Sequence, residues 1–162
     1  HAAARSMAAF WRENAANEDG TYRLAFDRPG SFSMKYNAVW DRVFELGLFE
    51  PTMWRQETEG YRRHMNPYGL PLDDRSDYTK SDWMVWTATL TEDAAFFGKI
   101  VAAIERAYRL SPSRVPMTDL YSSVTSMQIH FQHRSVQGGL FMKLLYDKGI
   151  CRGLMNTAED KK

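Results

Sequence analysis

Apolar residues recur every three to four positions along most of the chain, which is the spacing of one face of an amphipathic helix. The clearest pattern covers residues 31–47, and its apolar face consists of Phe32, Tyr36, Val39, Trp40, Val43 and Phe44. Similar patterns predict further helices over residues 6–17, 51–65, 82–90, 92–111 and 136–148. Because strict alternation is rare, we expect an all-α protein with fewer than about one residue in ten in strands.

Turn-forming residues separate the predicted helices. Asp19-Gly20 follows the first helix, and Asp27-Arg28-Pro29-Gly30 precedes the second. Residues 113–131 form a long polar loop, in which the pattern allows one short strand near residues 128–131. Short turns that alternate with long loops predict consecutive helical hairpins, with the long loops collected at one end and at most one short strand pair.

Small polar residues and glycines refine the helix ends. The predicted N-caps are Ser31, Ser81 and Thr91, because each offers a hydroxyl just before a helical pattern. Gly138 and Gly139 would weaken the last helix, so a close approach of another element is expected there.

The stretch YGLPLDDRSDYTKSDWMVWTATL, residues 68–90, passes from loop chemistry into a helix. Asp82 falls in the first helical turn, where the helix dipole favours negative charge. Ionisable and aromatic groups concentrated at one helix start are typical of a small-molecule site. These groups are Tyr78, Lys80, Asp82, Trp83 and Trp86. A capped helix whose tryptophans face the core explains the same residues equally well.

Composition excludes several classes of partner. The 162 residues suit one domain, and 44% hydrophobic residues can form a core. The net charge is +1, with 21 basic and 20 acidic residues, which gives no basis for nucleic acid or an anionic membrane surface. No apolar run reaches the roughly 20 residues of a membrane span. The single cysteine, Cys151, cannot form an internal disulfide.

Familiar catalytic signatures are absent from the sequence. Neither Ser-x-x-Lys nor Gly-x-Ser-x-Gly occurs. His130 and His133 lie three positions apart, but no carboxylate or cysteine completes a metal-ligand spacing. We therefore expect no metal site and no cofactor.

Carboxylates in the loops are the more informative candidates. Two carboxyl groups in different environments can divide into an acid and a base, although aspartate is also common at caps and turns for backbone reasons. The aspartates concerned are Asp27, Asp41, Asp73, Asp74, Asp77, Asp82 and Asp119. Arginines in the same loops could clamp a substrate carboxylate or form structural ion pairs, namely Arg28, Arg75, Arg114 and Arg134.

Four strings in the same order resemble the glutaminase A family, and the resemblance covers residues 22–146. They are YRLAFDRPGSFSMKYNAVWD, YGLPLDDRSDYTKSDWMVWTATL, RVPMTDLY and FQHRSVQGG. Members of this family are large exported proteins of fungi and gut bacteria. The resemblance implies an all-helical (α/α) six-hairpin toroid that follows β-rich domains, and an extracellular or periplasmic location.

The resemblance also implies an amidohydrolase that converts glutamine to glutamate and ammonia. Because this toroid is more familiar as a glycosidase scaffold, a carbohydrate-active domain that binds a saccharide is the alternative. A non-catalytic helical interaction module is the third hypothesis. The domain expectation is a partial toroid over residues 1–149 and a flexible tail over residues 150–162.

The site hypotheses come from the residues, since the resemblance brings no established catalytic residue. In the amidohydrolase hypothesis Asp82 is the acid or base, Lys80 and Tyr78 polarise the carbonyl, and Arg134 holds the substrate carboxylate. In the glycosidase hypothesis the two tryptophans stack on sugar rings. The substrate-binding candidates together are Asp27, Trp83, Trp86 and Arg134.

The resemblance finally implies that the chain is a fragment that is inactive alone. A six-hairpin toroid contains about twelve helices, and the pattern predicts about six. Half a toroid leaves an apolar flank open, around Phe10 and Trp11 at one end and Leu140 and Leu144 at the other. We expect this flank to pair with the remaining half of the toroid or to cause self-association.

Overall fold

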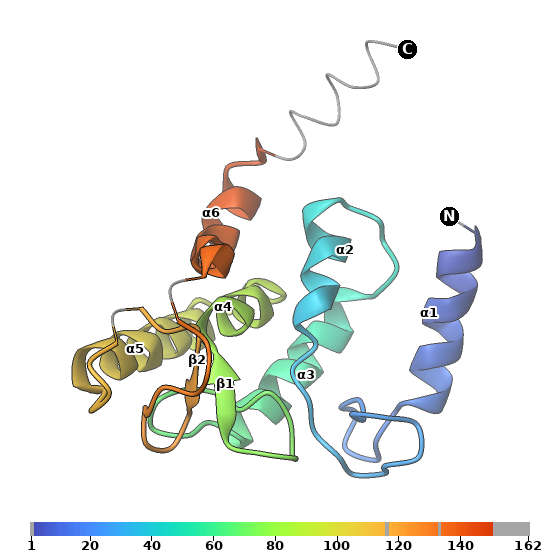
Figure 1. Ribbon diagram of the computed structural model, residues 1–162. Coiled ribbons are helices and arrows are strands. Elements are labelled where there is room, and N and C mark those ends of the chain that lie inside the picture. Colours follow the sequence, from blue (N-terminus) through green and yellow to red (C-terminus); the bar gives the residue numbers. More distant parts are fainter. Residues whose placement is uncertain (1, 116, 133, 151–162) are drawn as a thin grey trace.

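The computed structural model describes residues 2–115, 117–132 and 134–150. Its helices are α1 (Ala2–Asn14), α2 (Val39–Val43), α3 (Pro51–Arg63), α4 (Ser81–Thr89), α5 (Ala94–Leu110) and α6 (Met142–Asp147). Two 3-10 helices, η1 (Tyr36–Ala38) and η2 (Ser135–Phe141), and two strands, β1 (Tyr78–Lys80) and β2 (Leu120–Ser122), complete the described elements (Figure 1). The prediction of a mostly helical protein with one small strand pair is confirmed.

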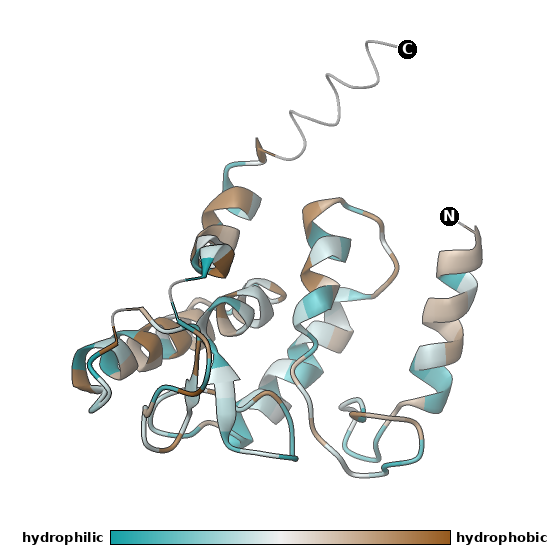
Figure 2. Ribbon diagram, in the orientation of Figure 1, coloured by the Kyte–Doolittle hydropathy of each residue, from teal (hydrophilic) through white to brown (hydrophobic). Residues whose placement is uncertain are grey.

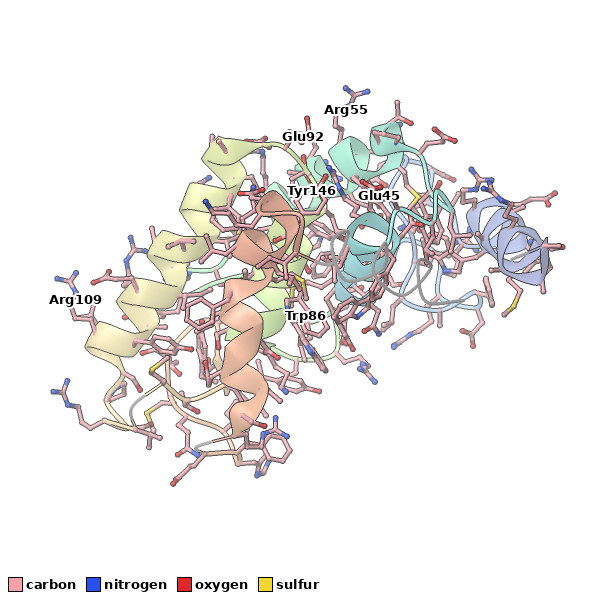
Figure 3. All side chains as sticks on the ribbon, turned by 90° about the horizontal axis from the view of Figure 1, so that it is seen from above. Glu45, Arg55, Trp86, Glu92, Arg109 and Tyr146 are labelled. Carbon is pink, nitrogen blue, oxygen red and sulfur yellow. The ribbon has the colours of Figure 1, made fainter. Side chains whose placement is uncertain are left out.

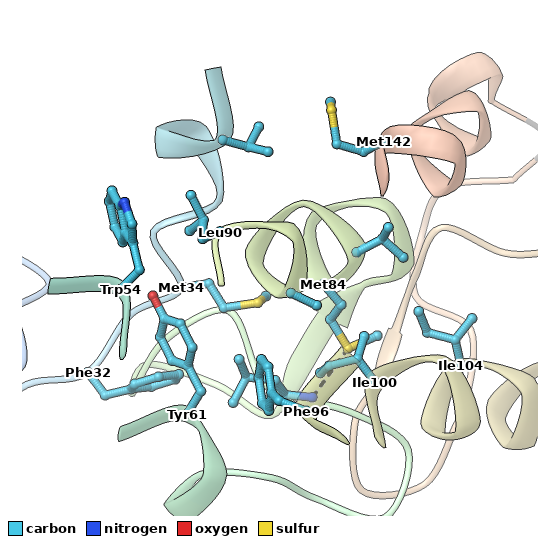
Figure 4. Packing of buried hydrophobic residues seen from close by; sticks show 14 of the residues in the cluster. Phe32, Met34, Trp54, Tyr61, Met84, Leu90, Phe96, Ile100, Ile104 and Met142 are labelled. Carbon is cyan, nitrogen blue, oxygen red and sulfur yellow. Dashed lines mark hydrogen bonds between the residues drawn. The ribbon is translucent and has the colours of Figure 1, made fainter. Parts of the chain in front are cut away.

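Helix α4 lies at the centre of the fold. It contacts α5, α6, η1 and η2, so almost its whole surface is buried. Met84 and Ala88 of α4 pack with Phe96 and Ile100 of α5 in the main hydrophobic cluster (Figure 4). Burial on every side explains why this helix carries apolar residues all round rather than on one stripe.

The strand pair connects the start of α4 to the long loop after α5. Strands β1 and β2 are antiparallel, with Thr79 opposite Tyr121 and Lys80 opposite Leu120. The strand predicted near residues 128–131 is wrong, because only an isolated bridge between Tyr121 and Gln128 lies there. The buried side chains of β2 favour the earlier position, since they complete the core beneath β1.

The helix predicted from residue 31 begins only at η1, and Ser31 is not its N-cap. The backbone N–H of Phe32 donates to the Asp74 carboxylate, and the N–H of Met34 donates to the Leu72 carbonyl at 2.8 Å. This pairing with a distant loop holds the segment extended. The helical period of its apolar residues is therefore overridden by a contact that a local pattern cannot reveal.

Two other predicted caps are also wrong. Ser81 is the first residue of α4 rather than its cap, and its hydroxyl is bonded to the Tyr108 hydroxyl at 2.7 Å. The N-cap of α5 is Asp93 rather than Thr91, because the Asp93 carboxylate accepts from the backbone N–H of Phe96 at 2.8 Å. A carboxylate satisfies the free amides of a first turn and also complements the helix dipole.

The last predicted helix divides into η2 and α6, and the glycine pair lies in η2. A Cβ atom at Gly139 would lie 2.8 Å from both Asp82 Cβ and Trp86 Nε1, whereas one at Gly138 would meet nothing within 4 Å. The predicted close approach is therefore confirmed at Gly139. It brings η2 directly onto the first turns of α4.

Helix α6 is tied to α2 through one arginine. The Arg42 guanidinium donates to the Leu90 carbonyl and to the Tyr146 hydroxyl, each at 2.6 Å. Arg42 also lies 4.9 Å from the centre of the Tyr146 ring. Arg42 of α2 thereby holds α6 close to the residue that follows α4.

Figure 2 colours hydrophobic stretches of α1 and α6 in tan and brown, and several of the exposed large apolar side chains belong to α1, η2 and α6. Met7 is 71% exposed and Leu144 is 56% exposed, and Phe10 and Phe141 are comparable. Trp11 and Leu140 are half-buried, and Trp11 stacks on Tyr22 with a centroid distance of 4.4 Å.

Among the described residues, no helix is both long and apolar enough to cross a membrane. Of the predicted tail, residues 150–162, only Ile150 is described, so Cys151 lies outside the described residues.

Candidate active site

The junction of β1 and α4 places three predicted site residues close together. Tyr78 and Lys80 lie on one side of β1 because side chains alternate along a strand, while Thr79 is fully buried on the other side. The Lys80 ammonium lies 3.1 Å from Asp119 Oδ2 and 4.4 Å from the centre of the Trp83 ring. Asp82 follows in the first turn of α4.

Asp119 is the residue that connects this junction to Arg134. Its side chain is fully buried and accepts from both the Lys80 ammonium and the Arg134 guanidinium. Burial pushes the pKa of Asp119 upward, but the hydrogen bonds from Arg134 and Lys80 outweigh it and hold the pKa below its ordinary value. Asp119 is therefore an ionised carboxylate between two cations.

Asp82 has the opposite electrostatic character. It is only 2% exposed, and burial is the main reason that its pKa is raised. The charge of Asp119 raises the pKa further, and the charge of Lys80 opposes the rise. Within the described residues, Asp82 Oδ1 and Asp119 Oδ1 are both buried without a hydrogen-bond partner. The pKa values of these two carboxyl groups are thus shifted in opposite directions, and each group keeps one oxygen without a hydrogen-bond partner among the described residues.

The two tryptophans of α4 are engaged within the fold. Trp83 stacks on Tyr36 with a centroid distance of 3.9 Å and an interplanar angle of 7°, so the Lys80 ammonium must occupy the other face of the indole. Trp86 donates from Nε1 to the Gly139 carbonyl at 3.1 Å and lies beside η2 (Figure 3). Both faces of the Trp83 indole are thus occupied, whereas Trp86 uses its N–H within the fold and lines a cavity with Trp40 and Gly139.

Arg134 lies next to the cluster, and Asp27 does not join it. The Arg134 guanidinium stacks over the Phe131 ring at 3.9 Å, and its side chain is 36% exposed. Asp27 is exposed in the turn of residues 25–28, within the loop that follows α1 (Figure 1). The structure therefore brings Lys80, Asp82 and Arg134 together, and leaves Asp27 at the surface.

Two tyrosines that the sequence pattern assigned to helix faces also border Asp82. The pKa of Tyr36 is raised by burial and by the charges of Asp82 and Asp73. The pKa of Tyr108 is raised by burial and, to a smaller extent, by the charges of Asp82 and Asp119. The position of Tyr108 in the apolar stripe of α5 gave no sign of this contact, because only the fold brings α5 against the start of α4.

A cavity of about 510 Å³ opens beside Tyr36 and Trp83. Its aromatic lining also includes Trp11, Phe49 and Trp54. Asp73 and Arg75 supply charge at the same cavity, and their side chains form a bidentate pair with both distances at 2.8 Å. Trp83, which lines this cavity, directly follows Asp82 in the chain, but neither Asp82 nor Asp119 lines the cavity.

Several of the other candidate aspartates have structural partners. Asp41 accepts from the backbone N–H groups of Leu48 and Phe49, and Asp77 accepts from the Ser122 hydroxyl. These contacts are the backbone and turn roles expected of aspartate. Among the described residues, no group of three or more His, Cys, Asp or Glu could hold a metal ion, and His133 lies outside those residues.

The comparisons with known proteins agree on one family. The family model described as "Glutaminase A six helical-hairpin domain" matches residues 1–144. The chain is 29% identical over 128 residues to "Glutaminase A" of Aspergillus oryzae, which covers 75% of this chain and 18% of that protein. It is 24% identical over 174 residues to "Probable glutaminase" of Arthroderma benhamiae, which covers 88% of this chain and 20% of that protein.

The chain thus spans about a fifth of the length of these curated fungal relatives. No solved structure matches the chain significantly.

Proposed function

Because the chain belongs to the glutaminase A six helical-hairpin domain family, we propose that it forms part of an amidohydrolase domain that converts glutamine to glutamate and ammonia. The observation that carries the proposal is the buried pair of Asp82 and Asp119, whose pKa values are shifted in opposite directions. Such divided pairs are the usual means by which two carboxyl groups take separate roles in acid–base chemistry.

Asp82 is the group that moves the proton. In its carboxylate form, Asp82 takes a proton from the attacking water while the water oxygen bonds to the amide carbon. In its protonated form, Asp82 returns that proton to the departing nitrogen, which leaves as ammonia. A raised pKa suits both halves of this cycle, because the ideal catalytic pKa lies near the working pH.

The cations of the cluster bind and polarise the substrate. Lys80, with Tyr78 on the same side of β1, stabilises the negative charge that develops on the carbonyl oxygen. Arg134 has five N–H donors, and those not engaged by Asp119 can bind the substrate carboxylate. The cavity beside Tyr36 and Trp83 lies at the residue that follows Asp82 in the chain, and η2 covers Asp82 at Gly139.

The domain proposal follows from the share of each relative that the chain matches. Residues 1–149 form part of a larger (α/α) toroid, with a tail over residues 150–162, and the site needs walls from the rest of that toroid. The chain alone is therefore inactive. The location is extracellular or periplasmic, and the substrate is a small molecule.

A helical interaction module is the second candidate, because Met7, Phe10, Phe141 and Leu144 expose apolar surface on the outer helices. The same surface could also contact the remaining half of the toroid. The two hypotheses are therefore separated by turnover, which only the amidohydrolase hypothesis predicts for the full-length protein. The glycosidase alternative has less support, because Trp83 uses both of its ring faces within the fold. Trp86 likewise uses its N–H group within the fold.

The experiment compares Asp82→Asn with Asp77→Asn in the full-length protein that carries this segment. Ammonia release from glutamine is measured beside sugar release from aryl glycosides. We expect Asp82→Asn to lower ammonia release on the order of 100-fold, because a positioned acid–base group contributes at least that much. The Asp77 carboxylate accepts from the Ser122 hydroxyl and is not part of the Lys80, Asp82, Asp119 and Arg134 cluster, so its variant should retain turnover. Undiminished ammonia release by Asp82→Asn would remove Asp82 from the chemistry.

A further inference from the structure

Asp119 contacts three separate elements around Asp82. Its carboxylate accepts from Lys80 of β1 and from Arg134 before η2, and its backbone carbonyl accepts from the N–H of Ser81 at 3.2 Å. We infer that Asp119 is a positioning residue that fixes Lys80, Arg134 and the start of α4 around Asp82. The inference rests on the proposed function.

The geometry separates the role of Asp119 from that of Asp82. The Oδ2 atom of Asp119 already accepts from both cations, whereas Asp82 forms no ion pair with either of them within the described residues, so Asp119 is the less suited of the two to take a proton from water. Its position immediately before β2 is fixed by the pairing of Leu120 with Lys80. Asp119 therefore acts on substrate only through the groups that it orients.

The ionisation of Asp82 reports on this arrangement. The groups that face Asp82 from the surrounding elements are Lys80 of β1, Asp119 before β2, Arg134 before η2, Tyr36 of η1 and Tyr108 of α5. Neutralising Asp119 removes a like charge and frees both cations to favour the carboxylate form of Asp82. The pKa of Asp82 must then fall, whether Asp82 works as the acid or as the base.

The test is Asp119→Asn in the full-length protein, with Asp119→Glu as the charge-conserving variant and Asp77→Asn as the control. Two readouts are taken: the pH profile of kcat and KM with glutamine, and the titration of Asp82 by carboxyl carbon-13 NMR. In Asp119→Asn we expect kcat to fall on the order of 100-fold, as small misplacements of reacting groups do. KM should rise because Arg134 loses its orientation.

The pH readouts distinguish positioning from mere stability. In Asp119→Asn the limb of the profile that belongs to Asp82, and its NMR midpoint, should both move to lower pH. Asp119→Glu should keep both near their wild-type positions while kcat stays reduced, and this variant decides the question if Asp119→Asn does not fold. Asp77→Asn should change neither.

Each failure has its own signature. Turnover on glutamine with an Asp82 midpoint that stays unmoved in Asp119→Asn would overturn the inference and leave the proposed function standing. No turnover by the wild-type protein would overturn the proposed function, and the NMR midpoint would still show whether Asp119 controls Asp82.

Discussion

In the part of the chain that the structure describes, two buried lysines each face a buried carboxylate, and the two pairs differ in how many of their polar atoms have hydrogen-bond partners. In the first, Lys35 donates to the Tyr22 carbonyl at 2.7 Å and to the carbonyl and hydroxyl of Ser33 at 2.8 Å each. Glu57 of α3 accepts from the backbone N–H of Tyr22 at 2.6 Å, and its other oxygen lies 3.8 Å from the Lys35 ammonium. In the second, Lys80 and Arg134 converge on Asp119, and Asp82 stands beside them.

Burial acts on both pairs, with different outcomes. It is the main cause that lowers the pKa of Lys35 and raises that of Glu57, so each is pushed toward its neutral form. Asp119 instead keeps a lowered pKa because two cations bind it, while Asp82 has a raised one. The Lys35 network bonds mainly to backbone and holds the loop after α1 against α3. The Asp119 cluster keeps free acceptor atoms, which is the capacity a substrate site needs.

The largest expected effect comes from breaking the first pair, Lys35 and Glu57. Glu57→Leu leaves the Lys35 ammonium buried without its carboxylate, and removing one partner of a buried pair destabilises a protein by about 3–5 kcal/mol. Glu59→Leu on the same helix is the control, because Glu59 is exposed and pairs only with Arg62, an interaction worth about 0–1 kcal/mol. Urea unfolding measures both variants, and the double variant Lys35→Met with Glu57→Leu should recover much of the loss. Equal losses from Glu57→Leu and Glu59→Leu would contradict the structural role of the pair.

The same pair predicts a pH dependence. The pKa of Glu57 is raised above its ordinary value of 4.5 in the folded protein, so protonation favours the fold. Its contribution to stability is present below about pH 4.5 and is lost as the pH rises through the folded pKa. This decline should disappear in Glu57→Leu. A slope that persists in the variant would mean that another group causes it.

The sequence predicts the helices far better than it predicts which distant segments pair with one another. Helices α3, α4 and α5 follow from apolar spacing because each buries one or more faces against neighbours at that period. The start of η1 does not follow, because residues 31–35 pair with a loop some forty positions away, at Leu72 and Asp74. Long-range pairing leaves no periodic signal.

The candidate site shows the same limit. Lys80 and Asp82 are neighbours in the sequence, so a local pattern could find them. Asp119 binds Lys80 across a gap of 39 positions, and Glu57 pairs with Lys35 across 22. Asp119 is one of seven candidate aspartates in the sequence, and no local pattern singles it out, since a loop aspartate by itself indicates a cap or turn as readily as a site.

An effect of intermediate size is expected from disturbing the packing of η2 on α4, beside Asp82. Gly139→Ala places a methyl group 2.8 Å from Asp82 Cβ and Trp86 Nε1, and such overpacking costs about 1–3 kcal/mol. It should also weaken the hydrogen bond from Trp86 and lower turnover in the full-length protein. Gly138→Ala meets open space and should change neither property measurably. Thermal unfolding with tryptophan fluorescence measures the difference, and identical behaviour of the two alanine variants would show that η2 does not rest on α4.

The smallest expected effects are stability changes of opposite sign in Asp73→Asn and Asp82→Asn. Asp73 accepts three hydrogen bonds from Arg75, and the side-chain ones are the main cause that lowers its pKa. Asp82 has a raised pKa and an unpaired oxygen. At pH 7, Asp73→Asn should therefore lose about 1–2 kcal/mol of stability, whereas Asp82→Asn should gain about 1 kcal/mol, because an amide removes a poorly compensated buried charge.

The pH dependence of these two variants should run in opposite directions. The contribution of Asp82 to wild-type stability is lost as the pH rises through its raised folded pKa, so the gain in Asp82→Asn grows above the ordinary value of 3.8. The contribution of Asp73 is present above 3.8 and is lost as the pH falls through its lowered folded pKa, so the deficit of Asp73→Asn shrinks in acid. Urea unfolding at pH 3 and pH 7 measures all four differences. A loss of stability in Asp82→Asn at pH 7 would show that the fold stabilises the Asp82 carboxylate as fully as water does. The Asp119 cluster would then have its polar atoms as well satisfied as the Lys35 and Glu57 pair.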